Sequence, residues 1–212
     1  MKALIIGGTG ATGRDLVNVL LSDPDYTHVV SFVRRSAGIS HPKLTEHIID
    51  FNELDNFAAY MHGDVWFSCL GTTLKSAGSK DQQWRIDFEL PLKFAHIARR
   101  NGVSRAVLLS SFGASSSSNV YYLKIKGQLE EQIAGLMFEQ YIIFRPGHLL
   151  RANTDRPVER ITTGLLTFLN GLGFLKKYRA MPTATLAQKL GKAPKVLGTG
   201  VHVVELDQIF GF

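Results

Sequence analysis

Short apolar runs alternate along this chain with longer segments whose apolar residues recur at helical spacing. Residues 2–6 (KALII) form the first run, and a helical pattern (RDLVNVLL) begins at Arg14. Further apolar runs occupy residues 28–33, 46–49, 65–70, 105–109 and 140–147. Pro146 is expected to end the strand within the last of them. The segments between them, notably 52–61 and 82–101, are long enough for helices. We therefore predict strands and helices in alternation.

These apolar runs contain few polar residues, which is typical of strands buried on both faces of a parallel sheet. We predict an α/β fold with a doubly wound, mostly parallel sheet. Pro91 lies within the segment 82–101, and proline lacks the N–H group that a helix interior requires. We therefore expect a break there, with the better helix running from about Pro91 to Asn101.

Length and composition predict one domain, because 212 residues with 45% hydrophobic side chains can bury an ordinary core and no linker divides them. The lone Cys69 excludes an internal disulfide, and the first ten residues lack the pattern of a secretory signal, so we predict a cytoplasmic protein. Residues 161–175 are the longest apolar region, but they contain three glycines and fall short of the ~20 residues that span a bilayer. We expect a core or pocket-covering helix there, and no membrane span.

The formal charge of +6 suggests an anionic partner, but the basic residues are dispersed and no aromatic-interleaved patch accompanies them. A polyphosphate cofactor explains the charge better than nucleic acid does. The seven histidines show neither HxH nor HExxH spacing, so we predict no metal site.

A glycine-rich turn, GGTGATG, follows the first strand and opens the first helix, which is the context that a dinucleotide-binding fingerprint needs. Missing side chains let the backbone approach a pyrophosphate, and the helix N-terminal amides meet its negative charge. The alternative is a purely structural turn. The predicted contacts are Gly7, Thr9, Gly10, Ala11, Thr12 and Gly13.

The end of the second strand carries Arg34 and Arg35 where an NAD enzyme normally places an acid against the ribose. A guanidinium can pair with a 2′-phosphate, so we predict NADP(H) rather than NAD(H), although two solvated arginines remain an alternative. Asp50, after the third strand, could accept from the adenine amino group or cap the next helix. Leu70 and Gly71 end the fourth strand at the ligand-binding edge, where Gly71 could also serve only to turn the chain.

The stretch VYYLKIKGQ at 120–128 places Tyr122 one helical turn from Lys126, whereas Tyr121 meets Ile125 at the same spacing. The paired serines of LLSSFGA end the fifth strand at the same edge of the sheet. Together these motifs resemble the short-chain dehydrogenase/reductase superfamily, which has a Rossmann fold and a Ser-Tyr-Lys centre. The segments CLGTT, LLSS-GA-SSN, YxxxKGxxE and FRPG-LL are similar to its atypical branch, which contains the human Tat-interacting oxidoreductase and its bacterial relatives. The resemblance runs from residue 1 to about 160.

The resemblance implies that Tyr122 exchanges a proton with a substrate, since a nearby ammonium favours the phenolate of a group whose free pKa is near 10. It implies that Lys126 also binds the nicotinamide ribose and that Ser111, or Ser110 one residue earlier, polarises the substrate oxygen. Where many relatives have an asparagine, this chain has Asp87. By the same resemblance, cofactor contacts are expected from Tyr122, Lys126, Pro146, Leu149 and Arg156.

We therefore predict an NADP(H)-dependent oxidoreductase acting on a small carbonyl or alcohol, as a monomer or homodimer. The nucleotide-binding core would span residues 1–150, and residues 151–212 would supply the substrate side of the same domain. The alternative is an NADP(H)-binding, redox-sensing module that contacts a protein partner without turnover. Sugar-nucleotide epimerisation is less favoured because only about sixty residues follow the sixth strand. An amphipathic helix edge is the alternative reading of Tyr122 and Lys126.

Overall fold

A computed structural model describes residues 1–150 and 179–212. Seven strands form one sheet in the order β3-β2-β1-β4-β5-β6-β9, and every neighbouring pair is parallel. The predicted doubly wound α/β fold is thereby confirmed. The strands are β1 (Lys2–Ile6), β2 (His28–Val33), β3 (Leu44–Ile48), β4 (Val65–Ser68), β5 (Arg105–Leu109), β6 (Gln140–Arg145) and β9 (Gly200–Glu205).

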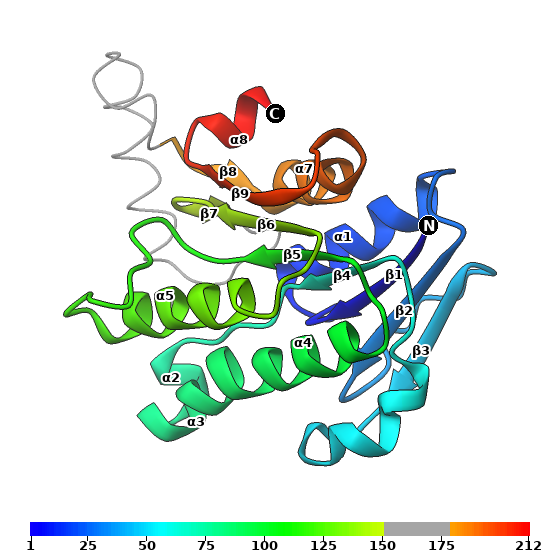
Figure 1. Cartoon of the computed structure of the whole chain (residues 1–212), viewed down its shortest axis with the longest axis horizontal. Helices are drawn as coiled ribbons and strands as arrows, with labels where there is room; N and C mark the ends of the chain where they lie inside the picture. Colours follow the sequence, from blue (N-terminus) through cyan, green and yellow to red (C-terminus); the bar gives the residue numbers. More distant parts are fainter. Residues whose placement is uncertain (151–178) are drawn as a thin grey trace.

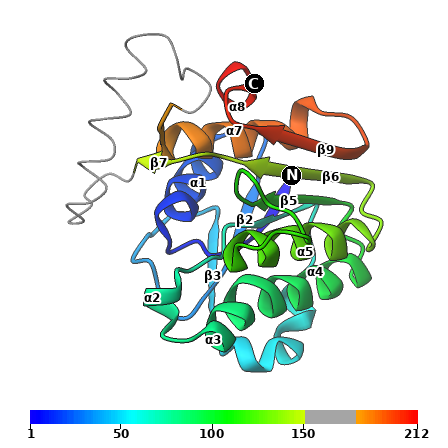
Figure 2. The same ribbon diagram turned by 90° about the vertical axis from the view of Figure 1, so that its left-hand side faces the viewer.

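Helices cover both faces of the sheet (Figures 1 and 2). The longer helices are α1 (Ala11–Ser22), η1 (Phe51–Tyr60, a 3-10 helix), α4 (Leu90–Arg100), α5 (Tyr121–Ala134) and α7 (Thr183–Val196). Along β1, Ala3 and Ile5 face the core under α1 and α7, whereas Leu4 and Ile6 face the core under α4 and α5, because successive side chains of a strand point to opposite faces. The shorter elements are α2 (Leu74–Ala77), α3 (Lys80–Trp84), α8 (Gln208–Gly211), and β7 (Leu149–Leu150) paired with β8 (Met181–Pro182).

The segment 82–101 is where the structure refines the prediction most. It divides into α3, a π-helical turn η2 (Arg85–Glu89) and α4. Pro91 falls in the first turn of α4, where a missing N–H costs little, so the expected change of helix geometry lies just before the proline. The π-helical turn directs Asp87 into the interior, where its side chain is fully buried.

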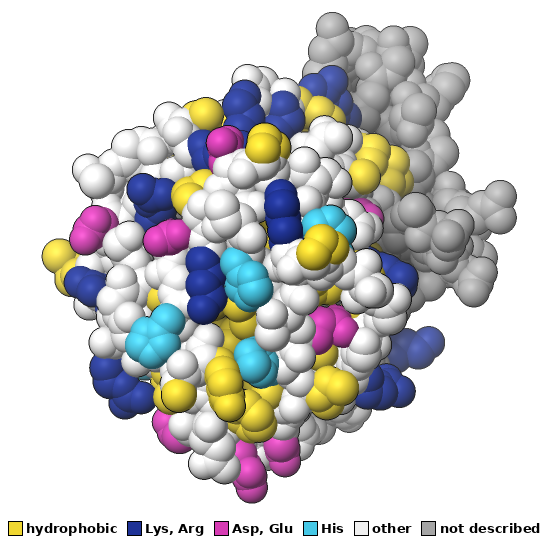
Figure 3. All heavy atoms as spheres, turned by 90° about the vertical axis from the view of Figure 1, so that its right-hand side faces the viewer, with side chains coloured by type: hydrophobic (Ala, Val, Ile, Leu, Met, Phe, Trp, Pro, Cys, Tyr) yellow, Lys and Arg dark blue, Asp and Glu magenta, His cyan; other side chains and the backbone are white. Residues whose placement is uncertain are grey.

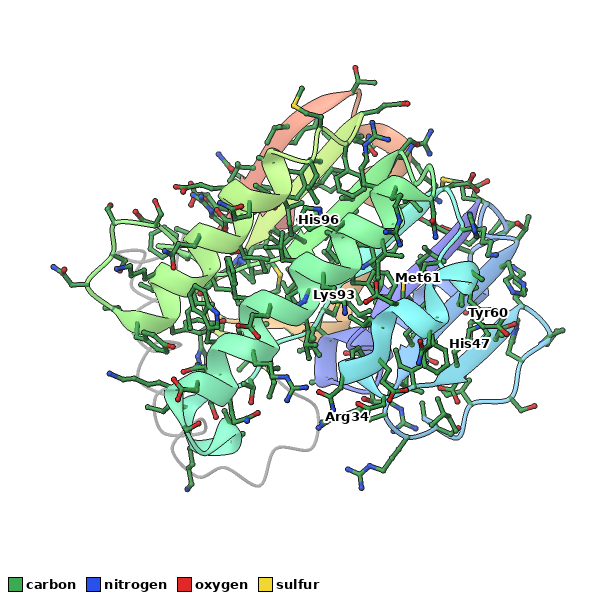
Figure 4. All side chains as sticks on the ribbon, turned by 60° about the horizontal axis from the view of Figure 1, so that its bottom comes forward. Arg34, His47, Tyr60, Met61, Lys93 and His96 are labelled. Carbon is green, nitrogen blue, oxygen red and sulfur yellow. The ribbon has the colours of Figure 1, made fainter. Side chains whose placement is uncertain are left out.

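The face beside β3 and η1 carries histidine and apolar side chains together (Figure 3). The His47 ring packs against the Tyr60 ring, tilted by 33° and with ring centres 4.3 Å apart, and Figure 4 shows this pair well apart from Arg34 at the end of β2. Burial lowers the pKa of His47, and the positive charge of Lys2 lowers it further. His96 lies exposed on α4 (Figure 4).

Two sequence predictions fall outside the described residues, namely the apolar helix at 161–175 and the cofactor contact at Arg156. Among the helices that the structure does describe, none has the length and apolar character to cross a membrane.

Candidate active site

The chain turns sharply between β1 and α1 because glycines leave space that side chains would fill. Gly7 has a φ of +82°, and a Cβ atom there would lie 2.5 Å from the backbone carbon of Cys69. A Cβ atom on Gly13 would lie 2.1 Å from the carbonyl oxygen of Gly7, so the first turn of α1 packs directly on the loop. No side chain caps this helix at Gly10, which leaves its N-terminal amides available to an anion.

Two cavities open at the carboxyl edge of the sheet, beside β1 and β4, where the strand order reverses. Their volumes are about 480 Å³ and about 760 Å³. Gly10, Cys69, Leu70 and Gly71 line both cavities, so the two are adjoining halves of one groove. The groove leads from the end of β2 past the glycine turn to α5.

The smaller cavity is positively charged. Arg34 and Arg35 line it together with Arg14 from the first turn of α1. No acidic side chain belongs to the described lining of this cavity. Glu46, on the neighbouring strand β3, accepts a hydrogen bond of 2.5 Å from the Ser36 hydroxyl instead. The three guanidinium groups therefore make this half of the groove suited to a phosphate.

The larger cavity contains the tyrosine and lysine of the YxxxK stretch, which lies on α5 as the spacing predicts. The Nζ atom of Lys126 is 5.9 Å from the centre of the Tyr122 ring. Tyr121 also reaches this cavity, but its hydroxyl donates to the Lys80 carbonyl oxygen at 3.0 Å, and the Lys80 ammonium lies 5.3 Å from its ring. Tyr121 thus ties α5 to α3, and Tyr122 is the tyrosine paired with Lys126.

Lys126 is 2% exposed, and its ammonium lies 3.5 Å from both the Asp87 carboxylate and the Leu70 carbonyl oxygen. Asp87 also accepts hydrogen bonds of 3.0 and 3.3 Å from the backbone amide of Thr72. Burial raises the pKa of Asp87, and Lys126 and the Thr72 amide oppose that rise. Burial raises the pKa of Cys69 to about 12, so this cavity-lining thiol stays neutral at physiological pH.

The paired serines after β5 differ in orientation. Ser110 lines the larger cavity, and its buried Oγ has no hydrogen-bond partner among the described residues. Ser111 is not part of the described cavity lining, and its hydroxyl points to the carbonyl oxygen of Phe112 at 3.5 Å. The geometry therefore places Ser110, the alternative left open above, where the sequence had placed Ser111.

Most of the predicted cofactor contacts line one cavity or the other, and three of those that the structure describes do not. Asp50 instead caps η1, accepting from the Asn52 amide at 2.8 Å. Pro146 is buried, and its carbonyl oxygen accepts from the Phe112 amide at 3.0 Å. Gly13 packs closely against the carbonyl oxygen of Gly7 in the glycine turn. Arg156 lies outside the described residues. The predicted residues that do line the groove are Gly7, Thr9, Gly10, Ala11, Thr12, Arg34, Arg35, Leu70, Gly71, Tyr122, Lys126 and Leu149.

Sequence reasoning missed several polar groups that line the groove. Arg14 could have been predicted from the sequence, since it directly follows the last glycine of the turn and occupies the first turn of the helix. Others come from α2 and α3, whose position no motif predicts, namely Ser76, Lys80 and Gln83. Thr72 and Thr73, which end the CLGTT segment, also line the larger cavity, although no role was predicted for them.

Comparison with known proteins identifies the family to which this chain belongs. A family model described as NAD(P)H-binding matches residues 7–169. Protein FMP52, mitochondrial, of Coccidioides immitis is 34% identical over 82% of this chain and 75% of its own length. Protein HTATIP2 of Rattus norvegicus is 37% identical over 70% of this chain and 63% of its own length. The structure of MoeE5 in complex with UDP-glucose and NAD superposes with a TM-score of 0.74 over 97% of this chain and 76% of that one, at 16% identity, and so shares the fold.

The comparisons also correct one prediction. Several fungal relatives are named as mitochondrial proteins, which contradicts the cytoplasmic location predicted from the sequence. That prediction rested on the lone Cys69 and the lack of a secretory signal pattern, and these features argue only against secretion. They do not distinguish the cytosol from an organelle, and the cytoplasmic assignment is withdrawn.

Proposed function

This chain belongs to the NAD(P)H-binding family as an atypical short-chain dehydrogenase/reductase-like protein, and from that premise we propose that it is an NADP(H)-dependent oxidoreductase acting on a small carbonyl compound or alcohol. The proposal treats residues 1–212 as one domain, with the substrate side supplied by residues 151–212. The observation that carries it is the lining of one groove by the glycine turn, an arginine cluster, and the set Ser110, Tyr122 and Lys126.

The residues of the groove fit a nicotinamide dinucleotide. The uncapped amides at the start of α1 suit the pyrophosphate, and the close approach of Gly7 and Gly13 leaves no side chain in its way. Arg14, Arg34 and Arg35 suit a 2′-phosphate, which NADP carries and NAD lacks. When bound, the nicotinamide supplies or accepts the hydride.

The side chains of the larger cavity would handle the proton and the substrate oxygen. Tyr122 donates its phenolic proton to the carbonyl oxygen during reduction and takes a proton from the alcohol during oxidation. The Lys126 ammonium favours the phenolate that remains. Ser110 is proposed in place of Ser111 as the hydrogen-bond donor to the same oxygen, because its hydroxyl has no other partner among the described residues.

The test of turnover uses NADPH with a panel of aldehydes and quinones. Tyr122→Phe should abolish turnover, because it removes the proton donor, while NADPH binding stays nearly intact. Tyr121→Phe is the matched control: it loses the hydrogen bond to Lys80, worth about 1 kcal/mol, and should keep most of the activity. If Tyr122→Phe turns over a confirmed substrate at the wild-type rate, the redox-sensing alternative replaces the enzyme.

The test of cofactor choice compares NADPH and NADH in the double variant Arg34→Ala/Arg35→Ala. Loss of charge-assisted hydrogen bonds to the 2′-phosphate should weaken NADPH binding by about 1–3 kcal/mol, which is roughly 5- to 150-fold. NADH binding should change little. Equal losses for the two cofactors, measured by calorimetry, would remove the basis for choosing NADP(H).

A further inference from the structure

A buried carboxylate contacts several residues that line the larger cavity of the candidate site. Asp87, on the π-helical turn η2, is 0% exposed. Its carboxylate accepts from the Thr72 amide, in the loop that follows β4 and lines the larger cavity, and lies 3.5 Å from the Lys126 ammonium on α5. Gln83, which is 3% exposed, adds a side-chain hydrogen bond. Each of these neighbours donates, so the surroundings suit a carboxylate.

Stability alone does not account for this pair. A buried ion pair costs several kcal/mol of desolvation per ion and is often replaceable by apolar residues without loss, so its presence is weak evidence of a stabilising role. Lys126 lines the cavity while being 2% exposed, and an ammonium in such a place needs a compensating charge. Asp87 is the acidic side chain that ion-pairs with it among the residues that the structure describes.

We propose that Asp87 is a positioning residue whose carboxylate holds the Lys126 ammonium beside Leu70, offsets its charge, and so sets the pH range in which Tyr122 transfers a proton. This inference rests on the oxidoreductase function proposed above. The pair together carries no net charge. Without the carboxylate, the uncompensated ammonium would stabilise the Tyr122 phenolate, so Tyr122 would lose its proton at lower pH.

The other titratable groups around the pair are few within the described part of the chain. On α5 they are Tyr122, Tyr121 and, one turn beyond Lys126, the buried Glu130, whose carboxylate pairs with the Arg145 guanidinium at 2.5 Å. On α3 the ammonium of Lys80 lies against Tyr121. After β4 comes Cys69, a neutral thiol because burial raises its pKa to about 12. The described lining from the glycine turn and β5 adds no ionisable side chain to this cavity. The carboxylate of Asp87 is therefore the charge whose removal should alter the field at Tyr122.

The experiment measures the pH dependence of kcat/KM for the full chain with NADPH and an accepted carbonyl, in the wild type and in Asp87→Asn. Asparagine keeps the shape and can still accept from Thr72, but it removes the charge. The alkaline limb of the reduction profile should move to lower pH by about one unit, as expected for a unit charge removed at close range in a protein interior. Asp81→Asn removes the same charge from an exposed position on α3 and should leave the profile in place. Asp87→Glu retains the charge and should keep the wild-type midpoint.

The outcomes separate this inference from the function on which it rests. A folded, NADPH-binding Asp87→Asn protein whose profile keeps its midpoint, or moves to higher pH, overturns the role given to Asp87 and leaves the enzyme assignment intact. If Asp87→Asn does not fold, Asp87→Ser provides a second uncharged variant. Failure of both to fold while Asp87→Glu folds would make the role purely structural and overturn the inference. A wild-type protein with no turnover on any carbonyl overturns the proposed function, and this inference with it.

Discussion

The contact between α5 and the serine-rich loop before it leads to a prediction that needs no substrate. Gly127 follows Lys126 on α5, and a Cβ atom there would lie 2.2 Å from the backbone carbon of Ser115 and 2.3 Å from the backbone nitrogen of Ser116. The loop is held in place by a bond from the Ser115 amide to the Leu123 carbonyl oxygen at 3.2 Å. Gly127→Ala therefore forces the helix and the loop apart.

Two opposing effects decide the size of the change. Ordinary contact for a Cβ atom begins at 3.4 Å, so the alanine methyl is short of space by about 1.2 Å, and both obstructing atoms are backbone. Such overpacking costs roughly 1–3 kcal/mol or more, whereas alanine gains up to about 1 kcal/mol over glycine in a helix interior. The steric cost is larger, and for a chain of this length it should lower Tm by roughly 3–8 °C.

Thermal unfolding followed by circular dichroism measures this effect, with Gly135→Ala as the control. A Cβ atom on Gly135, at the C-terminal end of the same helix, would meet its nearest neighbour at 3.4 Å, so Tm should change by about 2 °C at most. A shift of α5 by about 1 Å would also displace Tyr122 and Lys126, which can cost roughly 100-fold in turnover. A Tm for Gly127→Ala at or above that of the wild type would show that helix propensity dominates and that the close packing of α5 on the loop is absent.

Three further predictions concern the glycine turn, the paired serines and His47. Gly13→Ala, whose Cβ would lie 2.1 Å from a backbone oxygen, should weaken NADPH binding by about tenfold or more in a calorimetric titration; unchanged affinity would contradict the tight turn. Ser110→Ala should lower kcat more than Ser111→Ala does, because Ser110 lines the cavity, and the reverse order would restore the original assignment. Burial lowers the pKa of His47 below its ordinary 6.5, so the unfolded chain binds that proton first as pH falls, and stability is lost between 6.5 and the lowered value. His47→Gln should therefore flatten the fall of Tm from about pH 7 to about pH 5, while exposed His96→Gln should not.

Local sequence patterns determined several strands and two of the motifs of this chain. The strands β1, β2 and β5 have the bounds that their apolar runs predict, because a buried parallel strand is recognisable from its own residues. The glycine turn and the pairing of Tyr122 with Lys126 were also predictable from the sequence. Both depend on spacings of a few residues, within one strand–turn–helix unit or within one helix. The edge strand β9 was missed because its valines are interrupted by His202 and bounded by Gly200 and Glu205, so it lacks the continuous apolar run that marks a buried strand.

The composition of the site was decided by tertiary structure. Asp87 and Lys126 are 39 positions apart in sequence and meet only because η2 and α5 pack on the same side of the sheet. Arg14 joins Arg34 because the parallel order of β1 and β2 brings the start of α1 beside the end of β2. The choice between Ser110 and Ser111 depends on which way the chain turns after β5. Periodicity along a chain specifies which residues form an element. The distances between elements depend on how side chains fill the space between them, and this packing decides which charged groups of the site lie close enough to pair.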